Sequence, residues 1–130
     1  MKKKFSSEAL SDLIINGIQE KKGSDIVKLD LRKVPGAITD FFIICSGGSD
    51  TQIGAIADSV DEEVYKASQE LPWHKEGFSN KEWILLDYVN VVVHIFRKDR
   101  REFYDLESLW GDAVFSYYGD TLVPSKVPLH

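Results

Sequence analysis

The sequence has little cysteine and no long apolar run, and each absence excludes a class of protein. Cys45 is the single cysteine among 130 residues, so an internal disulfide is excluded and a reducing, cytoplasmic compartment is expected. No apolar run approaches the roughly 20 residues that span a bilayer, so we expect no membrane helix. The charged opening, residues 1–4, is not followed by the apolar stretch and small-residue cleavage site of a secretory signal.

A surplus of basic residues is also missing. The chain carries 16 Lys and Arg against 21 Asp and Glu, a formal net charge of −5. Nucleic-acid-binding domains usually show a basic footprint, so this balance argues against a generic nucleic-acid binder and favours a basic protein partner. One basic cluster, at Arg97, Lys98, Arg100 and Arg101, keeps open an RNA-contacting assembly factor, although a solvated turn and helix start is the simpler interpretation.

Apolar residues are plentiful, and their spacing predicts one packed domain. They make up 43% of the chain, enough for a core. The pattern predicts helices at 6–22, 49–71 and 99–110, and strands at 26–31, 40–45, 83–88 and 91–96. This order predicts an α/β fold, a small mixed β-sheet flanked by helices, within residues 1–112. Residues 113–130 are expected to be a C-terminal tail of unknown role.

The segment Ser46-Gly47-Gly48-Ser49, between a predicted strand and helix, is the most tempting catalytic site. Its glycines would allow close backbone approach to an anion, but it lacks the lysine of a phosphate loop. The layout resembles the start of the nucleotidyltransferase fold, whose metal site needs paired carboxylates, and here Asp87 stands alone. We therefore assign no catalytic residue, metal or cofactor, and keep a degenerate or active nucleotidyltransferase-like nucleotide-binding protein as the alternative.

The other reactive side chains give no stronger signal. Cys45 lies inside an apolar strand, where thiols are usually inert. His94 alternates with apolar neighbours, so a packed or interface histidine is expected rather than a ligand. His74 has no partner at metal-ligand spacing. A Cys–His pair stays open as a minor alternative.

Residues 101–110 set aromatics among charges, which is the composition of a protein-binding patch. Interface hot spots favour Trp, Tyr and Arg, and this segment contains Tyr104 and Trp110 beside Arg101. Strand alternation places Trp83 and Tyr88 on opposite faces of the predicted hairpin, unless twist at its end relaxes that rule. At its turn, Val89-Asn90, asparagine tolerates the positive φ that tight turns demand, although valine does so poorly.

Several stretches together resemble one known family. They are LDL at 29–31, ITDFFIICSG at 38–47, EG at 76–77, WILLDY at 83–88, VVVHIF at 91–96 and REFYDLESLW at 101–110. In order and spacing, over about residues 8–112, they resemble the Iojap-type ribosomal silencing factor family. The resemblance implies a domain shaped like a nucleotidyltransferase but lacking its active site.

The resemblance also implies a function. Such proteins bind the large ribosomal subunit through ribosomal protein uL-fourteen and sterically block small-subunit joining, which represses translation during nutrient limitation or stationary phase. A homodimer off the ribosome is expected. The implied partner-binding residues come from the hairpin and the closing segment: Trp83, Asp87, Tyr88, Tyr104, Leu106, Glu107 and Trp110. The chain departs from the family at Val89-Asn90, where Gly-Asp is usual, so the direction of Tyr88 stays open, as does whether Trp110 is contact or core.

Overall fold

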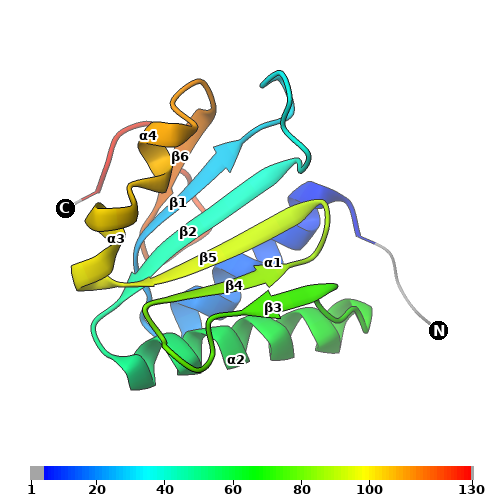
Figure 1. Ribbon diagram of the computed structural model, residues 1–130. Helices are drawn as coiled ribbons and strands as arrows, with labels where there is room; N and C mark the ends of the chain where they lie inside the picture. Colours follow the sequence, from blue (N-terminus) through cyan, green and yellow to red (C-terminus); the bar gives the residue numbers. More distant parts are fainter. Residues whose placement is uncertain (1–4, 130) are drawn as a thin grey trace.

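The computed structural model describes residues 5–129; the charged opening at 1–4 and His130 lie outside it. Within this range the chain forms a mixed six-stranded sheet with one face under two long helices (Figure 1). The strands are β1 Ser24–Asp30, β2 Phe41–Gly47, β3 His74–Glu76, β4 Trp83–Asp87, β5 Val91–Arg97 and β6 Val114–Tyr118. They lie in the order β3-β4-β5-β2-β1-β6, with β2 and β5 parallel and the other neighbours antiparallel. The predicted α/β class is confirmed.

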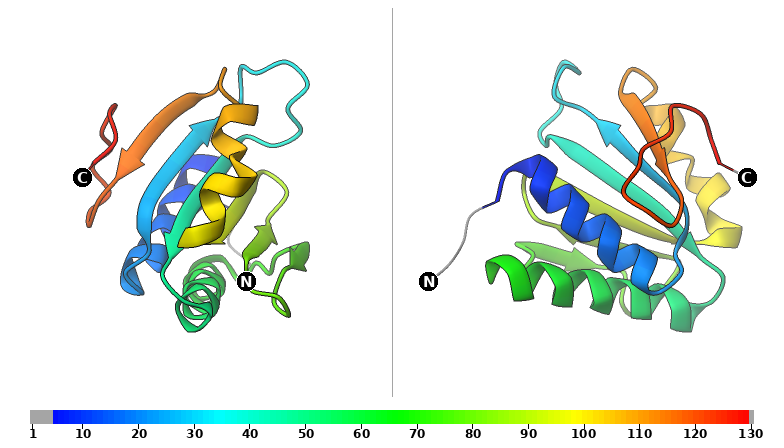
Figure 2. Two further views of the ribbon diagram at one scale, coloured as in Figure 1. Left: turned by 60° about the vertical axis from the view of Figure 1, so that its left-hand side comes forward. Right: turned by 180° about the vertical axis from the view of Figure 1, so that it is seen from behind.

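Helices α1 (Ser7–Glu20) and α2 (Asp50–Ser68) lie side by side across the back of the sheet (Figure 2, right). Their apolar stripes face the strands and are buried. Gly17 explains how closely the two helices approach, because a Cβ at this position would lie 2.9 Å from the Cα of Val60. The hydroxyl of Ser59 donates a hydrogen bond to the carbonyl of Gly17 at 2.7 Å. Gly17 therefore costs some helix propensity but permits close packing.

The start of α2 is as predicted and its end differs. Ser49 Oγ accepts a hydrogen bond from the backbone N–H of Gln52 at 3.1 Å, as an N-cap does. The side chain of Gln52 accepts in return from the N–H of Gly48. The helix ends at Ser68, because Gln69 turns into the left-handed region at φ 60°. Leu71, predicted as part of the buried stripe, is therefore 66% exposed.

The hairpin of β4 and β5 is confirmed, but its turn is not the expected one. Val89, rather than Asn90, takes the positive φ, at 78°. The N–H of Asn90 donates to the carbonyl of Tyr88 at 3.0 Å, which is the hydrogen bond of a γ-turn. The carboxylate of Asp87 accepts from the N–H of Val89 at 2.7 Å and supports this conformation.

Three elements differ from the prediction. The helix expected at 99–110 is broken into α3 (Lys98–Tyr104) and α4 (Leu106–Leu109), because Asp105 adopts φ 45°. β3 is a short edge strand that local patterning did not indicate. β6 pairs with β1 along five residues, so the sheet continues past residue 112, where the domain boundary had been placed.

Candidate protein-binding surface

The face of the sheet away from α1 and α2 carries a second apolar cluster that helices cover only in part. We call this face of the sheet the open face and its apolar residues the second cluster. Its buried members are Val27, Leu29, Leu31, Ile44, Phe96 and Leu106, and half-buried members packed on them include Phe42, Trp83, Trp110, Phe115 and Tyr117. The short helices α3 and α4 lie over one end of this face (Figure 2, left). The half-buried side chains beyond them form an apolar surface.

Trp83 is held by several contacts on the open face. Its ring stacks on Phe96 with centroids 4.9 Å apart and contacts Tyr104 at 4.8 Å. Its indole N–H donates to Nδ1 of His94 at 3.1 Å. A ring fixed on several sides loses little conformational freedom when a partner docks, so Trp83 is preorganised as an anchor.

His94 is buried beneath this aromatic layer and is uncharged. It accepts from the indole of Trp83 through Nδ1, so the proton lies on Nε2, which has no hydrogen-bond partner within residues 5–129. Phe42 packs edge-on against the imidazole at 4.6 Å. Burial lowers the pKa of His94 to about 3. The prediction of a packed histidine is confirmed.

Tyr104 and Trp110 both border the open face, from opposite sides of the break at Asp105. Tyr104 contacts Trp83, while Trp110 is half-buried and packs edge-on against Phe42 with centroids 5.7 Å apart. The sequence left open whether Trp110 was contact or core. In the structure one part of its surface packs on the second cluster and another part remains exposed.

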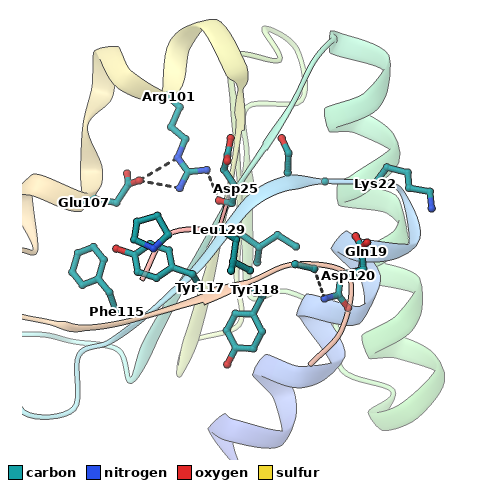
Figure 3. A pocket seen from close by; sticks show the side chains of 15 residues that line it. Gln19, Lys22, Asp25, Arg101, Glu107, Phe115, Tyr117, Tyr118, Asp120 and Leu129 are labelled. Carbon is teal, nitrogen blue, oxygen red and sulfur yellow. Dashed lines mark hydrogen bonds and ion pairs between the residues drawn. The ribbon is translucent and has the colours of Figure 1, made fainter. Parts of the chain in front are cut away.

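Arg101 fixes the α3–α4 segment to the sheet (Figure 3). Its guanidinium donates to the carbonyl of Asp25 at 2.6 Å and to the hydroxyl of Ser46 at 2.9 Å. It also donates to Glu107 through Nε at 3.2 Å and Nη2 at 2.9 Å. Sequence reasoning treated Arg101 as one of a solvated cluster and missed this role. Because its donors are engaged and its side chain is largely buried, Arg101 is poorly suited to contact RNA.

Two residues that were predicted to lie on the binding surface, Tyr88 and Leu106, are instead buried. Tyr88 is 5% exposed and belongs to the cluster beneath the helices, because the alternation that puts Trp83 on the open face puts Tyr88 on the other. Leu106 is 8% exposed and packs within the second cluster, where it fastens α4 to the sheet. Asp87 is half-buried on the open-face side, with its carboxylate turned to the hairpin backbone.

The Gly-Ser loop after β2 is engaged in packing. Ser46 is buried and accepts from Arg101. A Cβ at Gly47 would lie 2.7 Å from a methyl group of Ile53, so glycine is required there for packing against α2. Asp87 pairs with Val92 at the opposite end of β5 from this loop, so the two do not converge on one site.

The other side chains considered from the sequence are Cys45 and the possible metal ligands. Among residues 5–129 there is no group of three His, Cys, Asp or Glu side chains placed to hold a metal ion. Burial raises the pKa of the Cys45 thiol to about 12, which suppresses the nucleophilic thiolate. None of the helices in this part of the chain has the length and apolar character needed to cross a membrane.

Comparisons with known proteins agree with the resemblance. The model of the RsfS family, described as ribosomal silencing factor during starvation, matches residues 4–127. A Halalkalibacterium halodurans protein named ribosomal silencing factor RsfS is 39% identical over 109 residues, which cover 84% of this chain and 92% of that protein. A crystal structure of a Chromobacterium violaceum protein superposes with a TM-score of 0.77 at 34% identity, covering 82% of this chain and 88% of that one.

A more distant relative comes from an animal. A Mus musculus protein named mitochondrial assembly of ribosomal large subunit protein 1 is 29% identical over 104 residues, which cover 76% of this chain and 44% of that protein. The family match spans nearly the whole chain, and the bacterial relative is aligned over most of both proteins. The chain therefore belongs to the RsfS family of ribosomal silencing factors.

Proposed function

We propose that the protein represses translation by binding the large ribosomal subunit through ribosomal protein uL-fourteen and blocking small-subunit joining. The family description supports the silencing role, and the name of the mouse relative connects such chains with the large subunit. The observation that carries the proposal is the open face, with Trp83 and Tyr104 held in contact at its border. In this proposal the protein acts by occupying space on the large subunit and catalyses no reaction.

The open face suits a basic protein partner. Trp83 and Trp110 supply rigid apolar area, and Tyr104 adds an aromatic ring with a polar tip. The carboxylates of Asp87 and Glu107 are bonded to the N–H of Val89 and to Arg101, but both side chains are partly exposed and would meet basic groups of the ribosomal protein through their remaining lone pairs. An interface of about 1,200–1,600 Å² in total would hold the 14.8 kDa domain against the subunit.

A homodimer of the free protein is part of the proposal. Two copies that cover the open face would keep its half-buried aromatics from water until a ribosome is available. Sedimentation velocity over a concentration series tests this point: a sedimentation coefficient that stays at the monomer value up to tens of micromolar contradicts it.

Re-association of purified ribosomal subunits, followed on sucrose gradients, tests the main proposal. The wild-type protein should sediment with large subunits and reduce the peak of joined ribosomes. Trp83→Ala and Trp110→Ala should lose most of this effect while their circular dichroism spectra remain those of folded protein. Val123→Ser, an exposed apolar position on the C-terminal segment, serves as the control.

Two results would count against the proposal. Full re-association in the presence of saturating wild-type protein would refute the steric mechanism. Folded Trp83 and Trp110 variants that bind like the wild type would show that the partner uses another face.

A further inference from the structure

A second apolar surface lies on the other side of the molecule, along the exposed side of α2. A groove of about 300 Å³ runs there, lined by Asp58, Asp61, Glu62, Tyr65 and Leu71. Asp61 and Glu62 each lie three or four residues from both Asp58 and Tyr65, so the four share one side of the helix. After the turn at Gln69 the chain runs back beside this side, which brings Leu71 to the groove although it is not helical.

Trp73 follows the groove residue Leu71 by two positions and directly precedes the edge strand β3. Its N–H donates to the carbonyl of Asp87 at 2.7 Å, which fixes the backbone just before β3. Its ring lies against that of His74, the first residue of β3, with centroids 6.1 Å apart. An ion pair at 3.7 Å joins Lys75 of β3 to Asp61 of α2.

These aromatic and aliphatic side chains are unusually free of cover. Trp73 is 77% exposed and Leu71 is 66% exposed, while Tyr65 of α2 is about half exposed. Adjoining exposed large side chains of this kind mark interaction sites more often than chance, whereas isolated ones do not. Among the described residues, no other helix or strand is drawn over the outer side of α2 in the two views of Figure 2.

The charges around the groove define the partner. Asp58 is exposed and makes no ion pair with any residue of the range 5–129, whereas Asp61 is paired with Lys75 through Oδ2 at 3.7 Å and its Oδ1 is buried. Glu62 is paired with Lys66 at the far rim, at 3.1 Å. The free carboxylate of Asp58 beside exposed apolar side chains favours an incoming ammonium or guanidinium group, and the three acidic side chains together repel nucleic acid and anionic lipid.

We propose that the α2 groove docks a basic protein segment, with an apolar side chain against Tyr65 and Leu71 and a lysine or arginine at Asp58. The groove and the open face lie on opposite sides of the sheet, so both can be occupied together. The inference does not depend on the ribosomal proposal. If both hold, the chain brings a second basic protein to the subunit that it silences.

The test uses two fluorescent peptides of one design, with leucines at helical spacing and the remaining positions either lysine or glutamate. The lysine peptide should bind the full-length protein with micromolar affinity, measured by anisotropy, and should shift amide signals of residues 58–73 in NMR spectra. The glutamate peptide should not bind. Asp58→Lys and Leu71→Ser should each weaken the lysine peptide at least tenfold.

A matched control separates a built site from general charge attraction. Glu102→Lys makes the same change of charge as Asp58→Lys, but at an exposed position of α3, away from the groove. It should leave the peptide affinity within twofold. Equal losses in both charge variants, or signals that shift outside residues 58–73, would overturn the proposal. Loss of self-association in Leu71→Ser would assign the groove to a second copy and also overturn it. Since no ribosome is present, failure here leaves the subunit-joining test untouched.

Discussion

At the scale of single residues, the hydroxyl of Tyr88 is a defect in an otherwise apolar core. It is buried and makes no hydrogen bond with the described residues, and burial, followed by the charges of Asp61 and Glu70, raises the pKa of the phenol. An unsatisfied buried polar group costs about 1–3 kcal/mol. Tyr88→Phe keeps the ring and removes the hydroxyl, so we expect the free energy of unfolding in urea to rise by about 1 kcal/mol.

The same variant tests where Tyr88 acts. Because the ring lies beneath the helices and away from the open face, Tyr88→Phe should bind large subunits like the wild type. A less stable variant would mean that the hydroxyl finds a partner in solution. A stable variant that no longer binds would return Tyr88 to the binding surface, where the family resemblance had placed it.

His94 should make stability depend on pH. Its pKa is about 3 in the folded protein against 6.5 in the unfolded chain. Between these values the unfolded chain binds a proton that the folded protein does not bind. The free energy of unfolding therefore falls as pH drops below about 6.5, by up to about 1.4 kcal/mol per pH unit. Urea unfolding at pH 7, 6 and 5 should show this slope.

His94→Gln is the control for that slope, since its amide oxygen still accepts from the indole of Trp83 and does not titrate. Carboxylates whose pKa is lowered in the fold, such as Asp30, lose their contribution only at more acidic pH. Between pH 6.5 and 5 the free energy of unfolding of the variant should therefore depend less on pH than that of the wild type. Identical slopes would contradict a neutral, buried His94.

At the scale of elements, strong local sequence patterns were sufficient to predict a helix or a strand. Pairings between strands far apart in the chain could not be predicted in this way. The apolar stripes of α1 and α2 and the continuous apolar run of β2 depend on residues close in sequence, and these elements were predicted. β6 exists because it pairs with β1, more than eighty residues earlier, and nothing local requires it. The break between α3 and α4 at Asp105 was not predicted, because aspartate also fits a helical pattern. Its left-handed conformation, at φ 45°, is one that aspartate adopts as a single residue.

Arg101 determines how α3 and α4 sit on the sheet. Arg101→Met would remove its bonds to Asp25, Ser46 and Glu107 and leave a half-buried carboxylate without its cation. We expect a loss of about 2 kcal/mol in unfolding free energy and faster amide hydrogen exchange in residues 98–109 than in α2. Lys98→Met, an exposed change on the same helix, should alter neither, and equal exchange in both variants would contradict the anchoring role.

At the scale of the whole molecule, the candidate site follows from the two unequal faces of the sheet. Alternation predicted that Trp83 and Tyr88 point to opposite faces, and this is confirmed. It could not tell which face the long helices cover, because that depends on how α1 and α2 cross the sheet. The resemblance therefore led to the assignment of Tyr88 to the surface. It also led to the assignment of Leu106 to the surface, although this side chain is buried and holds α4 on the sheet.

The extent of the domain gives the last prediction. A chain ending at residue 112 would lose β6, which buries Tyr118 under the helices and packs Phe115 and Tyr117 on the second cluster. Full burial of a large apolar side chain contributes about 1.5–3 kcal/mol, so we expect a loss of at least about 3 kcal/mol in unfolding free energy. It would also leave β1 as an unpaired edge, which favours aggregation. A chain ending at residue 120 keeps β6 and should unfold within about 1 kcal/mol of the full length. Thermal and urea unfolding of both pieces decides the point, and equal stability of the shorter piece would place the boundary at 112 after all.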